Sequence, residues 1–335
     1  MTDSDSPLFN SRTSLNRIVS ALRDGKSFLL MTHIDPDADG IGSMLALGRA
    51  LLDAHKDVVL LTEKPVPPPY NRLRGADRIV QCLSSEREFD AVVVLDCAQI
   101  ERLGGFGTNL KHQKQLINID HHESNDFFGH LNLVDNNSSS TGELVFKVIK
   151  LGDFPVARDV AENLFAAIQA DTGSFRYENT TPTSFKIAAE MMECGANPWE
   201  LSQELIHGYG LSRLKLLERA LSTIEFHHAG KIGIMSLFLD MFVKAGAGPV
   251  DSERFVDYPR FVSGVELAVL IRQTGEDDYK FSLRSNGRVN VAQLAARFGG
   301  GGHAKAAGIE CHGSIEVLKK NFLKEAVRFL DGTPD

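Results

Sequence analysis

The chain has 335 residues, too many for one ordinary hydrophobic core, and its length therefore predicts two domains. Its 43% hydrophobic and 24% charged residues indicate a globular protein. No apolar run is long enough to cross a bilayer, and the acidic start of the chain carries no secretory signal. A net charge of -8 argues against binding of long nucleic acid by the whole surface, but it allows a small phosphate substrate. Four scattered cysteines without paired spacing predict a reducing, cytoplasmic setting.

The first half of the chain alternates predicted strands with predicted helices. Short, β-branched apolar runs predict five strands, at residues 27–32, 58–61, 91–95, 116–119 and 131–134. Helical spacing or helix-capping residues predict helices between or after them, at residues 41–54, from 138 onward and at 160–170. This alternation predicts an α/β fold with a doubly wound, mainly parallel five-stranded sheet.

The second half of the chain has a different pattern of predicted helices and strands. Residues 182–221 are predicted to be helical throughout, and hairpin-like strands framed by helices begin at residue 223. This pattern predicts a smaller α+β domain joined to the first by helices. The expected division is a first domain at 14–195, a helical linker at 196–222 and a second domain at 223–335.

Acidic and imidazole side chains follow several predicted strands at the point where each strand ends. Taken singly, each has a structural reading that is at least as common, as part of an acidic turn, as a solvated carboxylate or as a packed histidine. Because the carboxyl ends of parallel strands meet at one edge of a sheet, we expect these side chains to lie close together. The set comprises His33, Asp37, Asp39, Asp96, Asp120, His121 and His122, with Asp171 at the end of a predicted helix.

Such a set predicts a site for two divalent metal ions. The carboxylate of Asp171 is disfavoured by the helix dipole unless a cation compensates for it. Carboxylate and imidazole ligands suit manganese, with magnesium, cobalt or zinc as alternatives. Two metal ions about 3.5–4 Å apart activate a water molecule and clamp the attacking and leaving oxygens of a phosphoester. The predicted chemistry is therefore phosphoester hydrolysis.

The order of these motifs resembles that of the DHH phosphoesterase superfamily, and the resemblance covers nearly the whole chain from about residue 14. The matching segments of the first domain are residues 33–39, 96, 120–122 and 171–173. The second domain resembles the substrate-binding domain called DHHA1, at residues 282–286, 289–291 and 299–303. Length and motif order most resemble the bacterial nano-RNase group, whose members are bifunctional oligoribonucleases and phosphatases of 3'-phosphoadenosine 5'-phosphate (pAp).

Carried over residue by residue, the resemblance implies a role for each matching position. One manganese ion would be held by His33, Asp37 and Asp96, and the other by Asp39, Asp96, His121 and Asp171, with Asp96 bridging. Asp96 and His122 would be catalytic, since His122 would face the scissile phosphate, and Asp120 would orient its neighbours from behind. The substrate contacts implied in the second domain are Arg284, Ser285, Asn290, Gly300, Gly301, Gly302 and His303.

The implied activity is that of a manganese-dependent hydrolase acting on small phosphoesters. It would degrade short oligoribonucleotides from one end and remove the 3'-phosphate of pAp to give AMP, as a bisphosphate nucleotidase does. Residues 14–195 would form the catalytic DHH domain and residues 223–335 the DHHA1 domain. Short RNA and pAp would be its partners, without long duplex nucleic acid or a membrane. A homodimer is compatible with this reading.

Several rival readings stay open at this point. The alternative within the superfamily is a phosphodiesterase of cyclic di-AMP or of the linear dinucleotides pApA and pGpG. A manganese pyrophosphatase is expected to lack the glycine run at residues 299–302, and a RecJ-type exonuclease to be longer. From another class, a catalytically silent nucleotide-binding module would have lost metal ligands, whereas every expected ligand position is occupied here.

Overall fold

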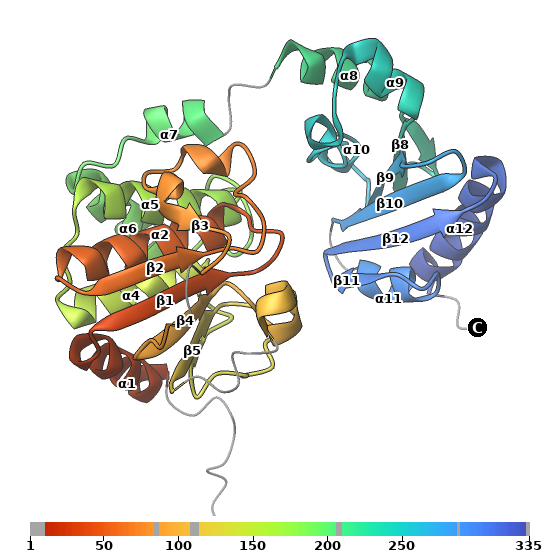
Figure 1. Cartoon of the computed structure of the whole chain (residues 1–335). Coiled ribbons are helices and arrows are strands. Elements are labelled where there is room, and N and C mark those ends of the chain that lie inside the picture. Colours follow the sequence, from red (N-terminus) through yellow and green to blue (C-terminus); the bar gives the residue numbers. More distant parts are fainter. Residues whose placement is uncertain (1–10, 84–86, 108–113, 206–209, 287–288, 333–335) are drawn as a thin grey trace, which may run out of the picture. The chain divides into compact units, whose positions relative to one another are not determined.

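The computed structural model describes residues 11–83, 87–107, 114–205, 210–286 and 289–332 (Figure 1). The chain divides into two compact units, Met1–Gly208 and Tyr209–Asp335. The first is built on a parallel sheet with helices and the second on another sheet with helices, so the predicted fold class is confirmed. Of the helices that the structure describes, none combines the length and the apolar character needed to cross a membrane.

The sheet of the first unit has six parallel strands among the described residues, in the order β3-β2-β1-β4-β5-β6. Its strands are β1 (Ser27–Thr32), β2 (Asp57–Leu61), β3 (Ile79–Val80), β4 (Ala91–Leu95), β5 (Leu116–Asp120) and β6 (Leu131–Val134). The prediction of five strands omitted β3, because two residues are too few to display a strand pattern. The direction in which successive strands are added to the sheet reverses between β1 and β4. At such a topological switch point, the loops that follow the two strands diverge.

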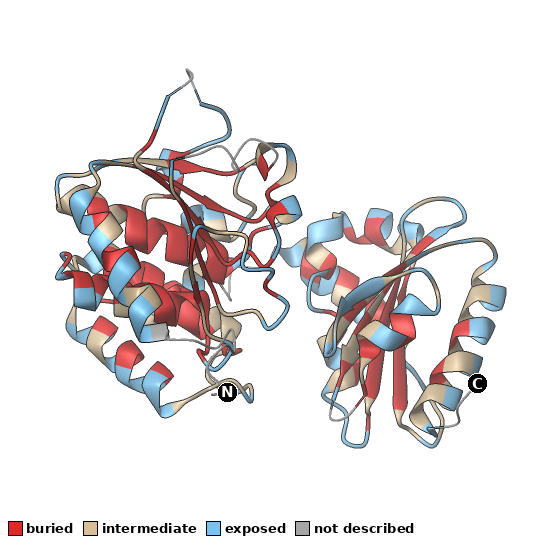
Figure 2. Cartoon of the chain, turned by 90° about the horizontal axis from the view of Figure 1, so that it is seen from below, coloured by how far each residue is buried: buried red, intermediate tan, exposed pale blue. Residues whose placement is uncertain are grey.

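Both faces of this sheet are buried, which explains why its central strands are almost continuously apolar. One face packs into a core with helices, whereas the other packs against the short helix η3 (Ile100–Phe106). Figure 2 shows how the buried residues concentrate in the strands and on the helix faces that meet them. The helices of the first core are α1 (Ser11–Asp24), α2 (Ala38–Asp53), α4 (Thr141–Gly152), α5 (Arg158–Asp171), α6 (Pro182–Glu193) and α7 (Pro198–Leu205).

Close packing of α2 against α5 matters for the position of the site. A Cβ atom on Gly42 would lie 2.6 Å from the carbonyl oxygen of Asn163 and 3.2 Å from the Cβ of Ala167. Glycine therefore lets the start of α2 approach the last turns of α5. This contact brings Asp39, in the first turn of α2, toward Asp171, the last residue of α5. Two short helices, η1 (Tyr70–Arg72) and η2 (Ala76–Arg78), complete the unit's described elements.

The second unit contains a six-stranded sheet among its described residues, in the order β11-β12-β10-β9-β8-β7. All neighbouring pairs are antiparallel except β8 with β9. Its strands are β7 (Glu225–His227), β8 (Ile232–Leu237), β9 (Leu267–Gln273), β10 (Asp278–Ser285), β11 (Gly301–His303) and β12 (Ala306–His312). Its helices are α8 (Leu211–Leu221), α9 (Leu239–Ala245), η4 (Pro249–Ser252), α10 (Asp257–Arg260), α11 (Val291–Ala296) and α12 (Ile315–Leu330).

Strand β10 alternates between the two faces of this second sheet. Tyr279, Phe281 and Leu283 are buried in the core that α11 and α12 cover. Because side chains of a strand alternate, Lys280, Ser282 and Arg284 lie on the opposite face, where all three are partly buried. The same alternation places neighbouring residues of β10 on different faces.

Candidate metal centre

The predicted ligands of the first unit lie at the carboxyl ends of three adjacent strands and at the end of one helix. Asp37 and Asp39 follow β1, Asp96 follows β4, and His121 follows β5. Among the described residues, ligand atoms of these side chains form three groups, and within each group the atoms lie within 4.8 Å of one another. The groups are His33 with Asp37 and Asp96, Asp39 with His121 and Asp171, and Asp96 with His121 and His122.

Asp96 lies between the first two groups and offers one oxygen to each. Its Oδ2 is 3.6 Å from Nε2 of His33, whereas its Oδ1 is 3.8 Å from Nε2 of His121. Nε2 of His121 is also 3.8 Å from Oδ2 of Asp39 and 3.6 Å from Oδ2 of Asp171. A carboxylate with this placement can bridge two cations.

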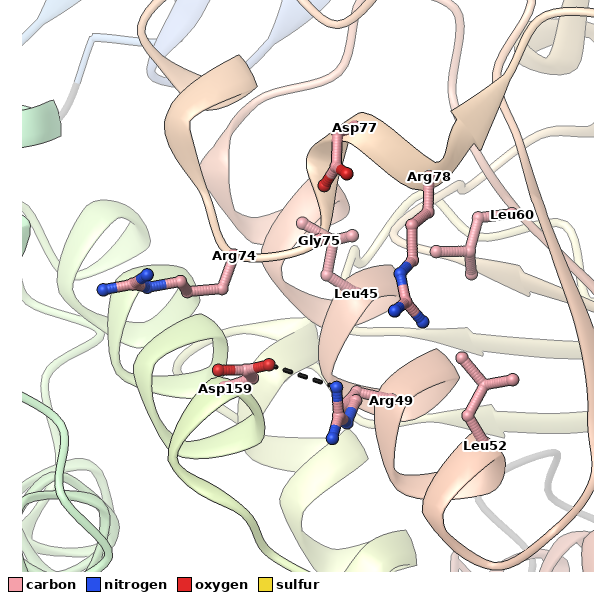
Figure 3. A pocket seen from close by; sticks show the side chains of 9 residues that line it. All are labelled: Leu45, Arg49, Leu52, Leu60, Arg74, Gly75, Asp77, Arg78 and Asp159. Atoms are coloured by element: carbon pink, nitrogen blue, oxygen red, sulfur yellow. Dashed lines mark hydrogen bonds and ion pairs between the residues drawn. The ribbon is translucent and has the colours of Figure 1, made fainter.

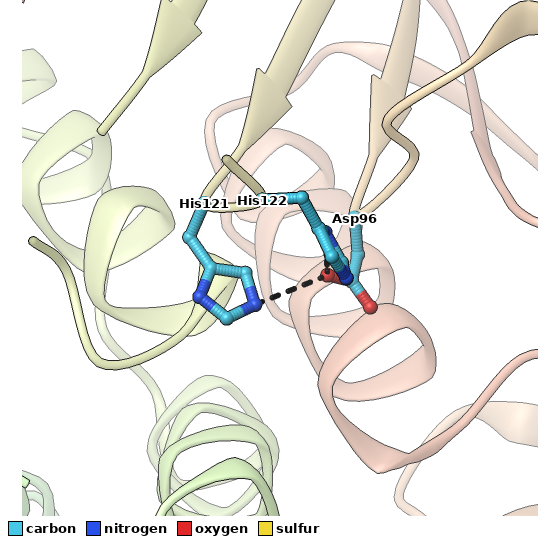
Figure 4. A group of neighbouring side chains, drawn as sticks. All are labelled: Asp96, His121 and His122. Carbon is cyan, nitrogen blue, oxygen red and sulfur yellow. Dashed lines mark ion pairs between the residues drawn. The ribbon is translucent and has the colours of Figure 1, made fainter. Parts of the chain in front are cut away.

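The third group joins His122 to Asp96 and His121 (Figure 4), but Nδ1 of His122 is already engaged by Asp120. Nδ1 lies 2.7 Å from Oδ1 of Asp120 and 3.7 Å from Oδ1 of Asp96. An ionised carboxylate can only accept, so Nδ1 donates to Asp120 and cannot also bind a metal ion. Burial alone would lower the pKa of His122, but its hydrogen bond to Asp120 and the charge of Asp96 raise it to about 9. His122 is therefore suited to hold a proton.

Asp120 is itself fixed from behind by the loop that follows β5. It is fully buried, and its Oδ2 accepts a hydrogen bond of 2.6 Å from the side-chain amide of Asn125. The same amide donates to Oδ1 of Asn118 at 2.8 Å, inside the sheet. The imidazole of His122 is thus held by a chain of buried polar contacts.

The backbone around Asp96 is adapted to its central position. Asp96 has φ of 56°, in the left-handed region that Asp tolerates better than most residues. A Cβ atom on Gly40 would lie 3.2 Å from Oδ2 of Asp96 and still closer to the hydroxyl of Thr32. Only glycine at position 40 leaves room for the carboxylate.

Asp39 and Asp171 are held by contacts from outside the predicted motifs. Asp39 accepts backbone N–H donors from Thr141 at 2.7 Å and from Gly142 at 2.9 Å, at the start of α4. The side-chain amide of Asn179 donates to Oδ2 of Asp171 at 3.2 Å. Thr141, Gly142 and Asn179 were not among the predicted site residues, because the capping pattern at the start of α4 signals only a helix start and Asn179 stands in no motif.

The charges of the site fit divalent cations. Burial and the nearby charge of Asp96 raise the pKa of Asp39, and burial raises the pKa of Asp171 to about 7. Carboxylates that resist ionisation because they are buried beside other carboxylates are those that a cation would stabilise. Oxygen and imidazole donors of this kind suit Mn²⁺, Mg²⁺ or Zn²⁺.

His33 makes a further contact that the sequence did not predict. Its Nδ1 lies 3.1 Å from the guanidinium of Arg102.

The predicted substrate residues of the second unit lie in different surroundings. Arg284 and Ser285 are neighbours on β10, so they point to opposite faces, and Ser285 is buried. The Asn290 side chain accepts N–H donors from Ala292 and Gln293 as the N-cap of α11. Burial of Ser285 and helix capping by Asn290 are structural roles. Binding of substrate by these two residues stays a prediction.

The glycine run has a packing reason of its own. A Cβ atom on Gly300 would collide with the backbone of Gly308, and one on Gly302 would lie 2.5 Å from the carbonyl oxygen of Ala306. Gly302 also has φ of 143°. Close approach to β12 therefore demands glycine at both positions, whereas a Cβ atom on Gly301 would meet nothing within 4 Å. The His303 side chain lies outside the described part of the chain.

A cavity of about 210 Å³ lies elsewhere in the first unit, beside α2 (Figure 3). Arg49 and Arg74 line it, but Arg49 is paired with Asp159 at 3.3 Å and Arg74 with Glu162 at 3.0 Å. Arg78 and Asp77 line the cavity as well, so carboxylates offset much of the arginine charge. Of the described residues that line it, none belongs to the predicted site.

Comparison with protein families gives two matches along the chain. Residues 27–168 match the model of the DHH family, N-terminal domain. Residues 233–332 match the model of the DHHA1 domain. The first match covers the strands of the first sheet, and the second match covers most strands of the second sheet.

Similar proteins include two that are named bifunctional oligoribonuclease and PAP phosphatase NrnA. The chain is 34% identical to the protein of that name from Thermus thermophilus, over 89% of this chain and 88% of that protein. It is 26% identical to the one from Bacillus subtilis, over 89% and 92%. A crystal structure of an exopolyphosphatase-related protein from Bacteroides fragilis is 25% identical, with a TM-score of 0.88 over 98% of each chain.

Proposed function

This chain belongs to the DHH/DHHA1 phosphoesterase family and is a hydrolase, and from that premise we propose that it degrades short oligoribonucleotides and dephosphorylates pAp. We propose that it shortens RNA of a few nucleotides from one end and converts pAp to AMP. The observation that supports this most is that Asp96 belongs to the His33 group and also lies 3.8 Å from His121 of the Asp39 group, together with 34% identity to a protein named for both activities. The proposed domains are 14–195 and 223–335, joined by the linker 196–222.

Two divalent ions would activate a water molecule and neutralise the charge of the phosphate. We propose Mn²⁺ for both, with Mg²⁺ or Co²⁺ as alternatives. We propose that His33, Asp37 and Asp96 hold one ion. Asp39, Asp96, His121 and Asp171 would hold the other. The raised pKa values of Asp39 and Asp171 support this assignment, because a bound cation would compensate for their burial.

His122 is proposed to act on the substrate directly. Its Nδ1 donates to Asp120, and we assign the proposed contact with a phosphate oxygen or a leaving group to Nε2. A pKa of about 9 in the metal-free protein keeps the ring protonated near neutral pH, as a hydrogen-bond donor or proton donor must be. Asp120 holds the ring in the orientation and tautomer that this role needs.

The second unit is proposed to bind the phosphate or sugar of the substrate away from the bond that breaks. Arg284 offers a guanidinium that can bind a phosphate through two parallel hydrogen bonds. The open space at Gly301 would let a ligand approach the backbone closely. Anchoring one end of a short substrate favours short over long chains, because binding energy is used to position the scissile bond.

A hydrolysis panel with purified protein and Mn²⁺ tests this function. It compares pAp, pApA, pGpG, a long RNA, pyrophosphate and cyclic di-AMP at equal concentrations. We expect the highest kcat/KM for pAp and the linear dinucleotides. A preference for pyrophosphate or for the long RNA would contradict the proposal, and a preference for cyclic di-AMP would favour a cyclic-dinucleotide phosphodiesterase of the same family.

Two variants test whether the hydrolysis depends on the proposed metal ligands. Asp37→Ala and His121→Ala each remove a proposed ligand of one ion, and each should lower kcat by more than about a hundredfold. Asp35→Ala is the matched control, since Asp35 is an exposed acid in the same loop and belongs to none of the three groups. Full Mn²⁺-dependent activity in either ligand variant would remove that residue from the site.

A further inference from the structure

Thr141, the first residue of α4, contacts two proposed metal ligands at once. Its side-chain hydroxyl lies 3.0 Å from Oδ1 of Asp96, and its backbone N–H donates to Oδ2 of Asp39 at 2.7 Å. Thr141 is fully buried, so water does not compete for either contact. An ionised carboxylate can only accept, and the hydroxyl is therefore the donor to Asp96.

The contact with Oδ1 determines how the Asp96 carboxylate is rotated. Oδ1 faces His121 and Oδ2 faces His33, so each oxygen is directed at a different ligand group. The terminal torsion of an aspartate is soft and adopts a broad range of angles. A hydrogen bond to one oxygen selects the rotation in which both groups receive an oxygen.

The rest of α4 holds the hydroxyl in place without help from a metal ion. Ser140 caps the helix, and its side chain accepts the N–H of Glu143 at 3.2 Å. Gly142 packs so closely on α5 that a Cβ atom there would lie 2.7 Å from the Cβ of Ala167. Nδ1 of His122 lies 3.7 Å from the same Oδ1, so the Thr141 hydroxyl, at 3.0 Å, is the nearer of the two groups.

We propose that Thr141 is a positioning residue that makes Asp96 a bridge between two divalent ions. The inference rests on the proposed function, in which the two groups that share Asp96 each bind an ion. Without the hydroxyl, the carboxylate turns toward one group and serves the other poorly. Residues that orient a metal ligand in this way typically contribute about 10- to 100-fold to metal affinity. We expect this loss in the binding of the second ion.

The variants Thr141→Val and Thr141→Ser separate the hydroxyl from the shape of the side chain. Valine keeps the β-branch and the backbone N–H to Asp39, whereas serine keeps the hydroxyl. Mn²⁺ is titrated into the metal-free, full-length proteins by calorimetry, and electron paramagnetic resonance reports spin coupling between neighbouring Mn²⁺ ions. Wild type and T141S should bind two coupled ions. T141V should bind the second ion about 10- to 100-fold more weakly and lose the coupling.

Thr62→Val is the matched control, since the buried hydroxyl of Thr62 donates to the carbonyl oxygen of Lys64 and touches no proposed ligand. Unchanged second-ion affinity and coupling in T141V would overturn the positioning role, as would a loss of thermal stability alone. If T141V does not fold, Thr141→Ala replaces it with the same two readouts. A wild-type protein that binds fewer than two Mn²⁺ ions would instead overturn the proposed two-metal function.

Discussion

Asp96 is the carboxylate that lies between the two proposed ion sites of the first unit. Burial alone would raise its pKa, but His33, whose Nε2 lies 3.6 Å away, and the nearby His122 and His121 outweigh burial and lower it. Its left-handed backbone conformation has a free-energy cost on the order of 1 kcal/mol, which the surrounding contacts must offset. The carboxylate can therefore remain ionised in a buried position between two ligand groups.

Replacing Gly40 tests how tightly the space around Asp96 is filled. The new methyl group of Gly40→Ala would collide with the Thr32 hydroxyl and press on the Asp96 carboxylate. We expect a loss of about 1–3 kcal/mol in the free energy of unfolding and weaker Mn²⁺ binding, measured by urea denaturation and calorimetry. Gly105→Ala is the control, because a Cβ atom there meets nothing within 4 Å. Wild-type Mn²⁺ affinity in G40A would contradict the expectation.

The pH dependence of stability follows from the raised pKa of Asp171. Its folded pKa is about 7 against an ordinary value of 3.8, so the folded protein binds this proton more tightly than the unfolded chain does. The resulting stability is complete below about pH 4 and is lost as pH rises through about 7. In EDTA, we expect the free energy of unfolding to fall by about 2 kcal/mol between pH 5 and pH 8. His122, with its pKa raised to about 9, acts in the same direction at higher pH.

Urea denaturation at each pH measures this loss. Asp171→Asn is the informative variant, because an amide carries no titrating proton and should flatten the dependence between pH 5 and pH 7. The same slope in wild type and D171N would show that other groups cause it.

At the scale of elements, the two sheets use their faces differently. The central strands β4 and β5 of the first sheet are buried on both faces, whereas β10 alternates a core face with a face of partly buried polar side chains. Helix α12 closes the core on one side of the second sheet through Phe322, whose ring lies 5.5 Å from Phe281 and 5.7 Å from Phe298. The stability of the second unit therefore depends strongly on one helix.

Truncating Phe322 tests this dependence. Phe322→Ala should lower the free energy of unfolding of the second unit by about 3–5 kcal/mol, because Phe322 is fully buried and a cavity remains. Val317→Ala, on the same helix but 56% exposed, should change it by less than about 0.5 kcal/mol. Urea denaturation measures both. Mn²⁺ affinity should be unchanged in F322A, since the proposed metal ligands all belong to the first unit, and a large loss of affinity would contradict this separation.

At the scale of the whole molecule, the proposed roles divide between the two units. The proposed metal ligands lie in Met1–Gly208, and the proposed substrate contacts lie in Tyr209–Asp335. The two family matches divide the chain in the same order. Substrate binding and metal binding should therefore respond to different substitutions.

Arg284→Ala tests that division. Loss of a charge-assisted hydrogen bond to a phosphate, worth about 1.5–3 kcal/mol, should raise KM for pAp by roughly 10- to 150-fold. Mn²⁺ stoichiometry and affinity should not change. Steady-state kinetics and calorimetry measure the two effects. Arg328→Ala, which breaks a surface pair with Glu325, is the control. An unchanged KM in R284A would remove Arg284 from the proposed substrate site.

The sequence by itself determined the fold class and the candidate residues of the site. Buried parallel strands are continuous apolar runs, so five of the strands of the first sheet were visible without a structure. The family resemblance, carried by ordered motifs, led to the family that the comparisons show. The exception was β3, whose two residues carry no pattern and which is recognised only by pairing with β2.

Only the tertiary structure decided which atoms meet. Thr141 lies 45 residues from Asp96 along the chain and 102 from Asp39, and nothing in the local sequence predicts either contact. Strand alternation separated Arg284 from Ser285, and helix capping gave Asn290 a structural contact. The physical reason is that local patterns determine burial and backbone shape, whereas the orientation of a carboxylate depends on donors that folding brings from distant segments. The carboxylate of Asp96 is the clearest case.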